Sequence, residues 1–291
     1  MLNVAALVRA FDADAAAVLA KRWTLLDGIR ALLGRHGIPL SLDRSLFHGS
    51  RLYAAVALFH QERIVAAMRK VAAEEAPIET VRESCAAFWF PEETEQLALV
   101  HCGDLDRMLS SGLGQARPVD RGFERYVRAS GMEDLVRTGV GLVLVDELRT
   151  PEQAVRNHSD DYHLFTVHTD VIAGVPAKTG EAVVHESGHN LLNLFLEARG
   201  IQLAVEPHAY YSPWTRSMRH HRGIVHGFFV FCLVTMYYLG LCDEADSGRI
   251  DEYIAMQRRN LSGTLGSLRT ILSCYPRELG DLVENVYSAV E

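Results

Sequence analysis

Apolar residues recur at helical spacing over the first half of the chain. They fall three or four positions apart between residues 14 and 33 and again between residues 51 and 73. This spacing places them on one face of a helix, so we predict helices over both segments. Shorter helices are expected over residues 79–90 and 123–137. The first 138 residues are therefore predicted to form an N-terminal helical region.

The hydrophobic pattern changes at Gly139. Residues 140–145 are a short apolar run rich in β-branched side chains, and residues 162–172 form a second candidate of this kind. Short runs of this composition, bounded by glycine or aspartate, are typical of strands. We therefore predict a small β-sheet in the middle of the chain.

Helical spacing returns after the predicted strands. Glycines that end helices stand at Gly200 and Gly240. We predict helices over four segments: 180–199, 215–239, 250–272 and 276–290. The expected fold class is α+β, predominantly α-helical, with the small β-sheet beside the helix over residues 180–199.

The composition is that of a globular protein. The chain has 291 residues, of which 48% are hydrophobic and 23% charged, and no Pro-, Gly- or Ser-rich linker divides it. We expect one continuous globular unit. The net charge of −8 offers no basic surface, so a nucleic-acid partner is not expected.

The cysteines favour a reducing compartment. Their number is odd and none of them forms a C-x-x-C pair: Cys85, Cys102, Cys232, Cys242 and Cys274. Reduced thiols in a cytoplasmic protein are the simplest interpretation. The N-terminal residues also lack the basic region and long apolar run of a signal peptide.

One segment is apolar enough to cross a membrane. Residues 223–242 are 20 residues without a formal charge, which is the length of a membrane span. The run nevertheless contains His226, Thr235 and two tyrosines, and no second comparable stretch exists. We therefore predict a buried core helix and no membrane partner.

The strongest chemical signal is the sequence His185-Glu186-Ser187-Gly188-His189. On a helix, residues i and i+4 share a face, so both imidazoles can bind one metal ion. Most other residues of this helix are apolar, so its polar side chains must lie largely inside the protein and need partners. The sequence therefore predicts a metal site in the second region of the chain, residues 139–291, which we expect to be the catalytic region.

A catalytic metal ion usually takes a third protein ligand. The metzincin extension is absent, because Asn190, Leu191 and Leu192 follow the motif. The candidates for the third ligand are Glu206, His208 and His226. Glu197 lies two helical turns beyond His189 and is too far away to bind the same ion. His226 is favoured, because it is the one ionisable side chain of an apolar stretch and needs a partner.

A basic segment precedes His226. Ser212-Pro213-Trp214 is followed by Arg216, Arg219, His220, His221 and Arg222. If the helix begins near Thr215, Arg219 lies two turns before His226 on the same face and can bind a carboxylate with two hydrogen bonds. Cations at a helix N-terminus oppose the helix dipole and do not stabilise the helix. A role in binding an anion therefore explains this basic cluster better than a role in stability.

The two motifs together resemble one family. V-V-H-E-S-G-H-N-L-L over residues 183–192 and S-P-W-x-R-x-x-R-x-x-R-G-x-x-H-G over residues 212–227 are similar to those of the HExxH-type peptide β-hydroxylases of ribosomal-peptide natural product pathways. His220 departs from the proline that family members carry after Arg219, and Thr215 departs from an arginine.

The resemblance implies an oxygenase that uses Fe(II) and 2-oxoglutarate. It implies that His185, His189 and His226 are the iron ligands. By the same resemblance, Arg219, with Arg222 and Trp214 nearby, would bind 2-oxoglutarate. Glu186 would be a pocket residue, and the implied reaction is hydroxylation of an unactivated C–H, at the β-carbon of an amino-acid side chain. The implied substrate is a peptide, such as a ribosomal precursor peptide, or an amino acid.

Two other functions stay open at this point. In a zinc metallopeptidase, Glu186 would be the general base that activates a Zn(II)-bound water. A non-enzymatic peptide-binding protein with a structural metal would need a closed site of four ligands, and no thiol stands near the motif. The lack of a secretory signal and the Arg-rich segment favour the oxygenase.

Overall fold

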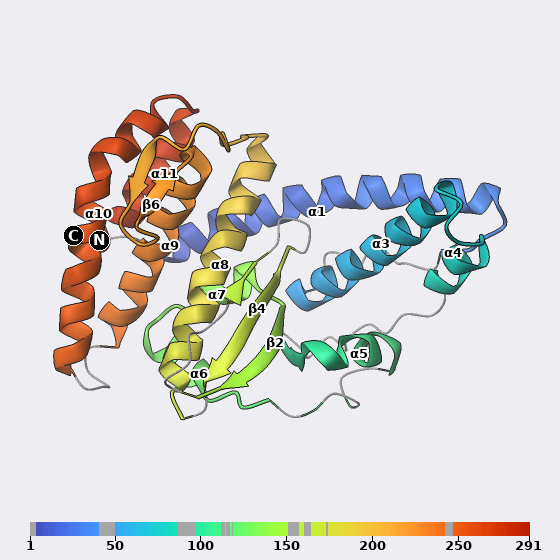
Figure 1. Cartoon of the computed structure of the whole chain (residues 1–291), viewed down its shortest axis with the longest axis horizontal. Coiled ribbons are helices and arrows are strands. Elements are labelled where there is room, and N and C mark those ends of the chain that lie inside the picture. The colour runs from blue at the N-terminus through green and yellow to red at the C-terminus, as the bar shows by residue number, and fades with distance from the viewer. Residues whose placement is uncertain are drawn as a thin grey trace.

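The computed structural model describes residues 4–40, 50–85, 97–111, 114, 117, 119–150, 157–159, 164–172, 174–241 and 247–291. The fold is predominantly α-helical α+β, as predicted, with a small sheet beside the long helix that carries the His-Glu motif. Figure 1 shows this helix, α8, crossing the sheet, with the C-terminal helices on one side and α3, α4 and α5 on the other.

The helices agree largely with the apolar periodicity. They are α1 (Val4–Arg35), α3 (Arg51–Ala72), α4 (Glu79–Ser84), α5 (Leu105–Ser111), α6 (Phe123–Ala129), α7 (Glu133–Gly139), α8 (Pro176–Arg199), α9 (His221–Gly240), α10 (Ser247–Leu272) and α11 (Arg277–Tyr287), with a 3-10 turn η1 (Cys102–Asp104). The end of the helix predicted over 79–90 lies outside the described residues.

Local signals explain where two of the helices begin and end. The Ser50 hydroxyl accepts a hydrogen bond from the backbone N–H of Tyr53 and caps α3. Pro176 is the first residue of α8, where its missing N–H costs nothing. Gly200 has a φ of 66° and ends α8, because glycine adopts this left-handed conformation without strain.

The main sheet has four strands in the order β1-β2-β4-β3. The strands are β1 (Ala98–His101), β2 (Leu142–Arg149), β3 (Asn157–His158) and β4 (Thr166–Ile172). β1, β2 and β4 are parallel, and β3 pairs with β4 in the antiparallel direction. The two strands predicted from sequence are β2 and β4, with residues 162 and 163 outside the described part.

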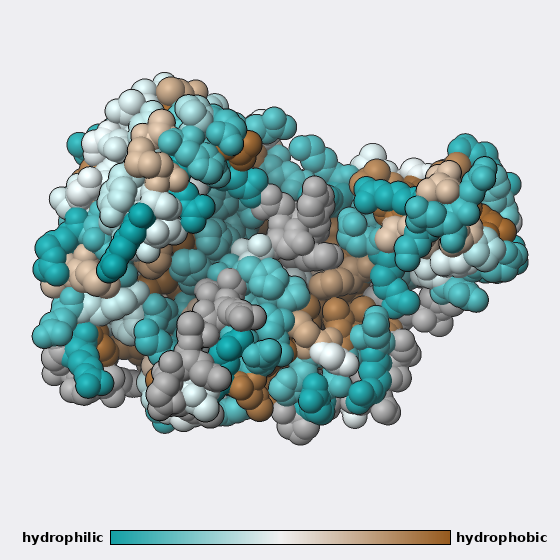
Figure 2. Space-filling view, in the orientation of Figure 1, coloured by the Kyte–Doolittle hydropathy of each residue, from teal (hydrophilic) through white to brown (hydrophobic). Residues whose placement is uncertain are grey.

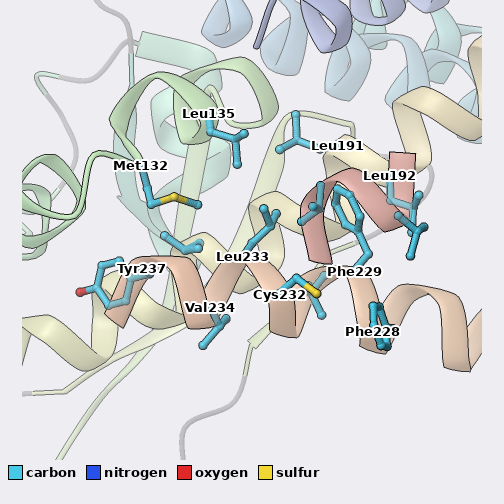
Figure 3. Packing of buried hydrophobic residues seen from close by; sticks show 14 of the residues in the cluster. Met132, Leu135, Leu191, Leu192, Phe228, Phe229, Cys232, Leu233, Val234 and Tyr237 are labelled. Carbon is cyan, nitrogen blue, oxygen red and sulfur yellow. The ribbon is translucent and has the colours of Figure 1, made fainter. Parts of the chain in front are cut away.

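Two hydrophobic cores cover the two faces of this sheet. Leu99, Val143 and Val167 face the core that α8 shares with α9, α10 and α11. The alternate residues Val100, Leu144 and their neighbours face a second core with α1 and α3. Parallel strands are normally buried on both sides in this way. Figure 3 shows the first core, in which residues of α9 such as Phe229 and Leu233 gather near Leu191 and Leu192 of α8.

α9 is a core helix, as predicted. Its composition and length would allow a membrane span, but 67% of its apolar window is buried inside the protein. The face of the molecule in Figure 2 is mostly hydrophilic, with hydrophobic residues in small patches. α8, α10 and α11 therefore cover the apolar surface of α9.

Two predictions about α9 and its approach were wrong. The helix begins at His221 and not at Thr215, because His220 accepts a hydrogen bond from the Gly223 N–H and caps it there. The preceding residues form an antiparallel hairpin of β5 (Tyr210–Ser212) and β6 (Ser217–Arg219). Arg219 is thus a strand residue, and the expectation that it shares a helix face with His226 fails.

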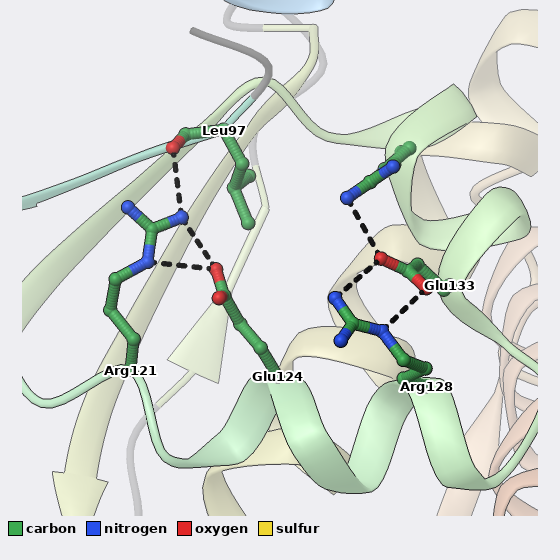
Figure 4. Close-up of polar contacts among 6 residues, drawn as sticks. Leu97, Arg121, Glu124, Arg128 and Glu133 are labelled. Carbon is green, nitrogen blue, oxygen red and sulfur yellow. Dashed lines mark hydrogen bonds and ion pairs between the residues drawn. The ribbon is translucent and has the colours of Figure 1, made fainter.

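The predicted helical N-terminal region also contains a strand, β1, which the sequence analysis missed. The single helix expected over residues 123–137 is two helices, α6 and α7, because Gly131 adopts a φ of 73° between them. One ion pair joins the two helices across this break (Figure 4): Arg128 of α6 contacts Glu133 of α7 at 3.0 Å. Within α7, Arg137 contacts the same carboxylate at 2.8 Å. Arg121 contacts Glu124 and donates to the Leu97 carbonyl just before β1.

Asn190 fastens α8 to the sheet. Its fully buried side-chain amide donates to the carbonyls of Gly139 and Thr166, each at 3.1 Å. These carbonyls lie beside the starts of β2 and β4, so the bonds fix the rotation of α8 about its axis.

We expect Asn190→Leu to lower the free energy of unfolding by about 1–3 kcal/mol, because it leaves two buried carbonyls without this donor. Urea denaturation measures the change. The matched control is Asn285→Leu at an exposed position of α11, where we expect a change within about 0.5 kcal/mol. Equal effects of the two substitutions would show that the amide does not anchor α8.

Candidate metal centre

α8 presents three metal-ligating side chains to one point. The ligand atoms of His185, Glu186 and His189 all lie within 4.8 Å of one another. The two imidazoles are four residues apart on the helix, and their ring centroids are 5.0 Å apart. The i, i+4 geometry expected from sequence is therefore present.

His226 of α9 joins this group. Its side chain is buried, and its Nδ1 lies 3.0 Å from Nδ1 of His189. Two nitrogens that bind one ion at about 2.0–2.1 Å, at octahedral or tetrahedral angles, are about 2.9–3.4 Å apart. The separation of these two nitrogens fits a shared metal ion.

The other candidates for the third ligand lie elsewhere. Glu206 and His208 are both largely exposed, and they contact each other at 3.8 Å in the loop after α8. Glu197 forms an ion pair with Arg22 at 2.9 Å. Among the alternatives from sequence, His226 is the one that contacts a motif imidazole, that of His189, and lines a pocket with both motif histidines.

Close packing of α8 on α9 sets this arrangement. Gly188 lies opposite Val230 and Leu233, and a Cβ at Gly188 would lie 2.8 Å from Val230 Cγ1. A second contact fixes the register of the helices, because Glu181 of α8 accepts hydrogen bonds from Tyr238 of α9 and from a tyrosine of α10. The imidazoles of the two helices meet because a glycine stands at the crossing.

The three imidazoles and Glu186 line a pocket of about 380 Å³. Its other lining residues are His158, Ser159, Asn193, His220, Arg222 and Gly223. An ion held here therefore faces a space that can admit a small ligand. A catalytic metal site needs such an open side, whereas a structural site is closed by its protein ligands.

Burial keeps the imidazoles neutral. It lowers the pKa of His185 to about 4, against a small opposing effect of Glu181. Burial also lowers the pKa of His189, and the neighbouring His226, His185 and Arg222 lower it further. Neutral imidazole is the form that binds a metal, so these side chains are ready to act as ligands at neutral pH.

Glu186 lies beside the ligands in a nearly dry position. Its side chain is 3% exposed, and burial raises its pKa to about 7, against the opposing effect of a hydrogen bond with Ser159. A carboxyl group with this pKa can give or accept a proton near neutral pH.

Arg222 is the arginine on the pocket wall. It is near enough to His189 to lower the pKa of that imidazole. Arg219, the arginine favoured by sequence for 2-oxoglutarate, instead donates from Nε to the hydroxyl of Thr215 in the hairpin, at 3.2 Å, and does not line the pocket.

Trp214 also lies outside the pocket, behind one of the ligands. Its ring stacks on Phe231 at 4.8 Å, and Phe231 contacts the edge of His185 at 5.2 Å. The indole N–H donates to Gln257 of α10 at 2.8 Å. Trp214 thus packs behind His185, and its contact with a co-substrate stays a prediction.

The sequence analysis missed His158 and Ser159 of the pocket wall. Both come from or directly follow β3, a strand of two residues. No hydrophobic alternation can mark so short a strand, and no motif surrounds it. Only the pairing of β3 with β4 brings these side chains to α8.

Comparison of the chain with protein-family models and with curated protein sequences finds no match to either. The likeness to the HExxH-type hydroxylases therefore rests on the two sequence motifs alone.

Gly188→Ala tests the role of the helix crossing. We expect the added methyl group to push α9 away from α8, to lower the free energy of unfolding by about 1–3 kcal/mol, and to weaken metal binding. Urea denaturation and a metal-competition titration measure the two effects.

The control is Gly263→Ala on the exposed side of α10, where a Cβ meets nothing within 4 Å. It should leave metal binding unchanged and raise stability by up to about 1 kcal/mol. If Gly188→Ala left the metal affinity unchanged, the close packing of α8 on α9 would not determine the position of His226.

Proposed function

We propose that this protein is a non-haem Fe(II)/2-oxoglutarate-dependent dioxygenase that hydroxylates an unactivated C–H of an amino-acid side chain. The observation that carries the proposal is that three imidazoles and Arg222 line one pocket, with His189 and His226 in contact. An oxygenase needs a few protein ligands and open positions on its iron, together with a cation for the co-substrate.

The residues present fit this chemistry. His185, His189 and His226 would hold iron, and burial lowers the pKa values of His185 and His189 so that both are neutral ligands at neutral pH. When bound, iron would activate O₂, the oxidant of the reaction, which no side chain of the protein can do. Arg222 would hold the distal carboxylate of 2-oxoglutarate by charge-assisted hydrogen bonds. Glu186 and Ser159 would hold a polar group of substrate or co-substrate at the pocket floor.

A second pocket supports a substrate larger than a free amino acid. It has a volume of about 580 Å³ and shares Asn193 and Arg222 with the metal pocket. Lys21 and Arg22 of α1 line it with Glu197 of α8. A peptide could extend from the metal centre into this space, so we favour a peptide, such as a ribosomal precursor peptide, over a single amino acid. We expect the protein to act in the cytoplasm, where Fe(II) and free thiols stay reduced.

The second candidate is a zinc metallopeptidase, and one observation favours it. A general base works best with a pKa near the working pH, and the pKa of Glu186 is about 7. Arg222 argues for the oxygenase, because a water-activating zinc site does not need a cation opposite its metal.

Succinate formation decides between the two. Protein loaded anaerobically with Fe(II) should consume O₂ and 2-oxoglutarate and release succinate. Arg222→Gln should raise the KM for 2-oxoglutarate about 10- to 100-fold, because it removes a charge-assisted contact of about 1.5–3 kcal/mol. Arg216→Gln, at an exposed residue of the hairpin turn, is the control and should leave this KM unchanged. Peptide cleavage by zinc-loaded protein without succinate from the iron form would establish the peptidase instead.

The third ligand has its own test. His226→Ala should lower the amount of bound metal as severely as His185→Ala, because both side chains would bind the ion directly. Elemental analysis after metal loading and desalting measures this. His208→Ala is the control, since His208 is half-exposed in the loop after α8. Loss of metal in His208→Ala with full occupancy in His226→Ala would move the third ligand into that loop.

A further inference from the structure

A second group of metal-ligating side chains lies on the sheet, away from the motif of α8. Cys102 directly follows β1, Asp146 lies in β2 and His168 lies in β4. Their ligand atoms all lie within 4.8 Å of one another. Cys102 Sγ is 2.8 Å from Asp146 Oδ1 and 3.7 Å from His168 Nδ1, and the last two atoms are 3.4 Å apart.

The strand register places these three side chains on one face of the sheet. Val100 of β1 and His168 of β4 both pair with Leu144 of β2. Cys102 begins η1 directly after β1 and packs against the core on this face, and Asp146 lies two residues beyond Leu144, where the register of β2 becomes irregular. The contacts of both side chains with His168 bring all three together on this face. α8 packs on the opposite face, where Leu99 and Val143 point. The group is therefore separate from the candidate metal centre of α8.

The arrangement is unlike a nucleophilic triad. In a triad, the nucleophile and the carboxylate contact opposite nitrogens of the imidazole, so that a proton can pass between them. Here the thiol and the carboxylate both lie at Nδ1 of His168. The three donor atoms converge on one point instead of forming a relay.

We propose that Cys102, Asp146 and His168 bind a zinc ion. Zinc accepts sulfur, nitrogen and oxygen ligands together, and a thiolate and a carboxylate would neutralise its two charges. All three side chains are partly buried, so few waters would have to be displaced. With three protein ligands, the ion keeps one position for a water or another donor.

This zinc site would connect β2 and β4 with the residue that follows β1, and it would affect the pocket of α8. The ring of His158 stacks on His168 at 4.3 Å with an interplanar angle of 14°. His158 also lines the pocket that contains His185 and His189. An ion that fixes His168 would thus fix His158 on the wall of the candidate active site.

Cobalt substitution tests the proposal independently of the proposed function. A thiolate bound to Co(II) gives a charge-transfer band in the near ultraviolet, whereas the imidazole site of α8 gives none. Co(II)-loaded protein should show this band, and His185→Ala/His189→Ala should keep it. Cys102→Ser should lose the band and one equivalent of bound metal. Cys274→Ser, at an exposed cysteine of the C-terminal part, is the control and should retain both.

Asp146→Asn is a second variant, for the case that Cys102→Ser does not fold. It keeps the shape of the side chain and removes its charge. It should weaken zinc binding at this site about tenfold or more while circular dichroism shows an unchanged fold. The absence of a thiolate band in the wild-type protein would overturn the proposal, and so would a band that survives in Cys102→Ser.

Discussion

Helices α8 and α9 can approach each other closely only because Gly188 has no side chain where they cross. The His-Glu motif itself contains this glycine, so one stretch of five residues supplies two of the proposed metal ligands and the space for the helix that carries the proposed third ligand. Glu181, one turn earlier, accepts hydrogen bonds from tyrosines of α9 and α10 and so prevents the helices from sliding. The positions of His189 and His226 follow from this packing.

The sheet is the second constraint, because it determines what lies behind α8. The Asn190 amide donates hydrogen bonds to two carbonyls near the starts of β2 and β4. With Asn190 facing the strands, the adjacent His189 faces α9. β3, at the edge of the sheet, brings Ser159 to Glu186. Glu186 and the Asn190 amide group thus meet partners from different elements, which lowers the cost of burying polar groups on so apolar a helix.

The sequence predicted those parts of the molecule that depend on local periodicity. The long helices, two of the strands and the shared face of His185 and His189 all follow from spacing along the chain. His226 could be selected because an ionisable residue in an apolar helix needs a partner. The split of residues 123–137 into two helices depends on the conformation of Gly131, which helical spacing alone does not reveal.

Features that depend on pairing between distant segments could not be predicted in this way. β5 and β6 have three residues each, too few for alternation to distinguish them from the start of a helix, so Arg219 was placed wrongly. The side chains of Cys102, Asp146 and His168 are separated by 44 and 22 positions and meet only through the parallel register. His158 and Ser159 carry no motif and reach the pocket through a strand of two residues.

The stack of Trp214, Phe231 and His185 has a consequence for metal affinity. Phe231 holds the edge of the His185 ring, Trp214 covers Phe231, and Gln257 of α10 fixes the indole by a hydrogen bond. These contacts restrict the rotation of the His185 imidazole before any ion binds. Its rotamer entropy is therefore lost when the protein folds and does not reduce the free energy of metal binding. A bound ion would then cost less side-chain entropy at His185. The hydrogen bond from Trp214 to Gln257 of α10 would in this way raise the metal affinity of a side chain on α8.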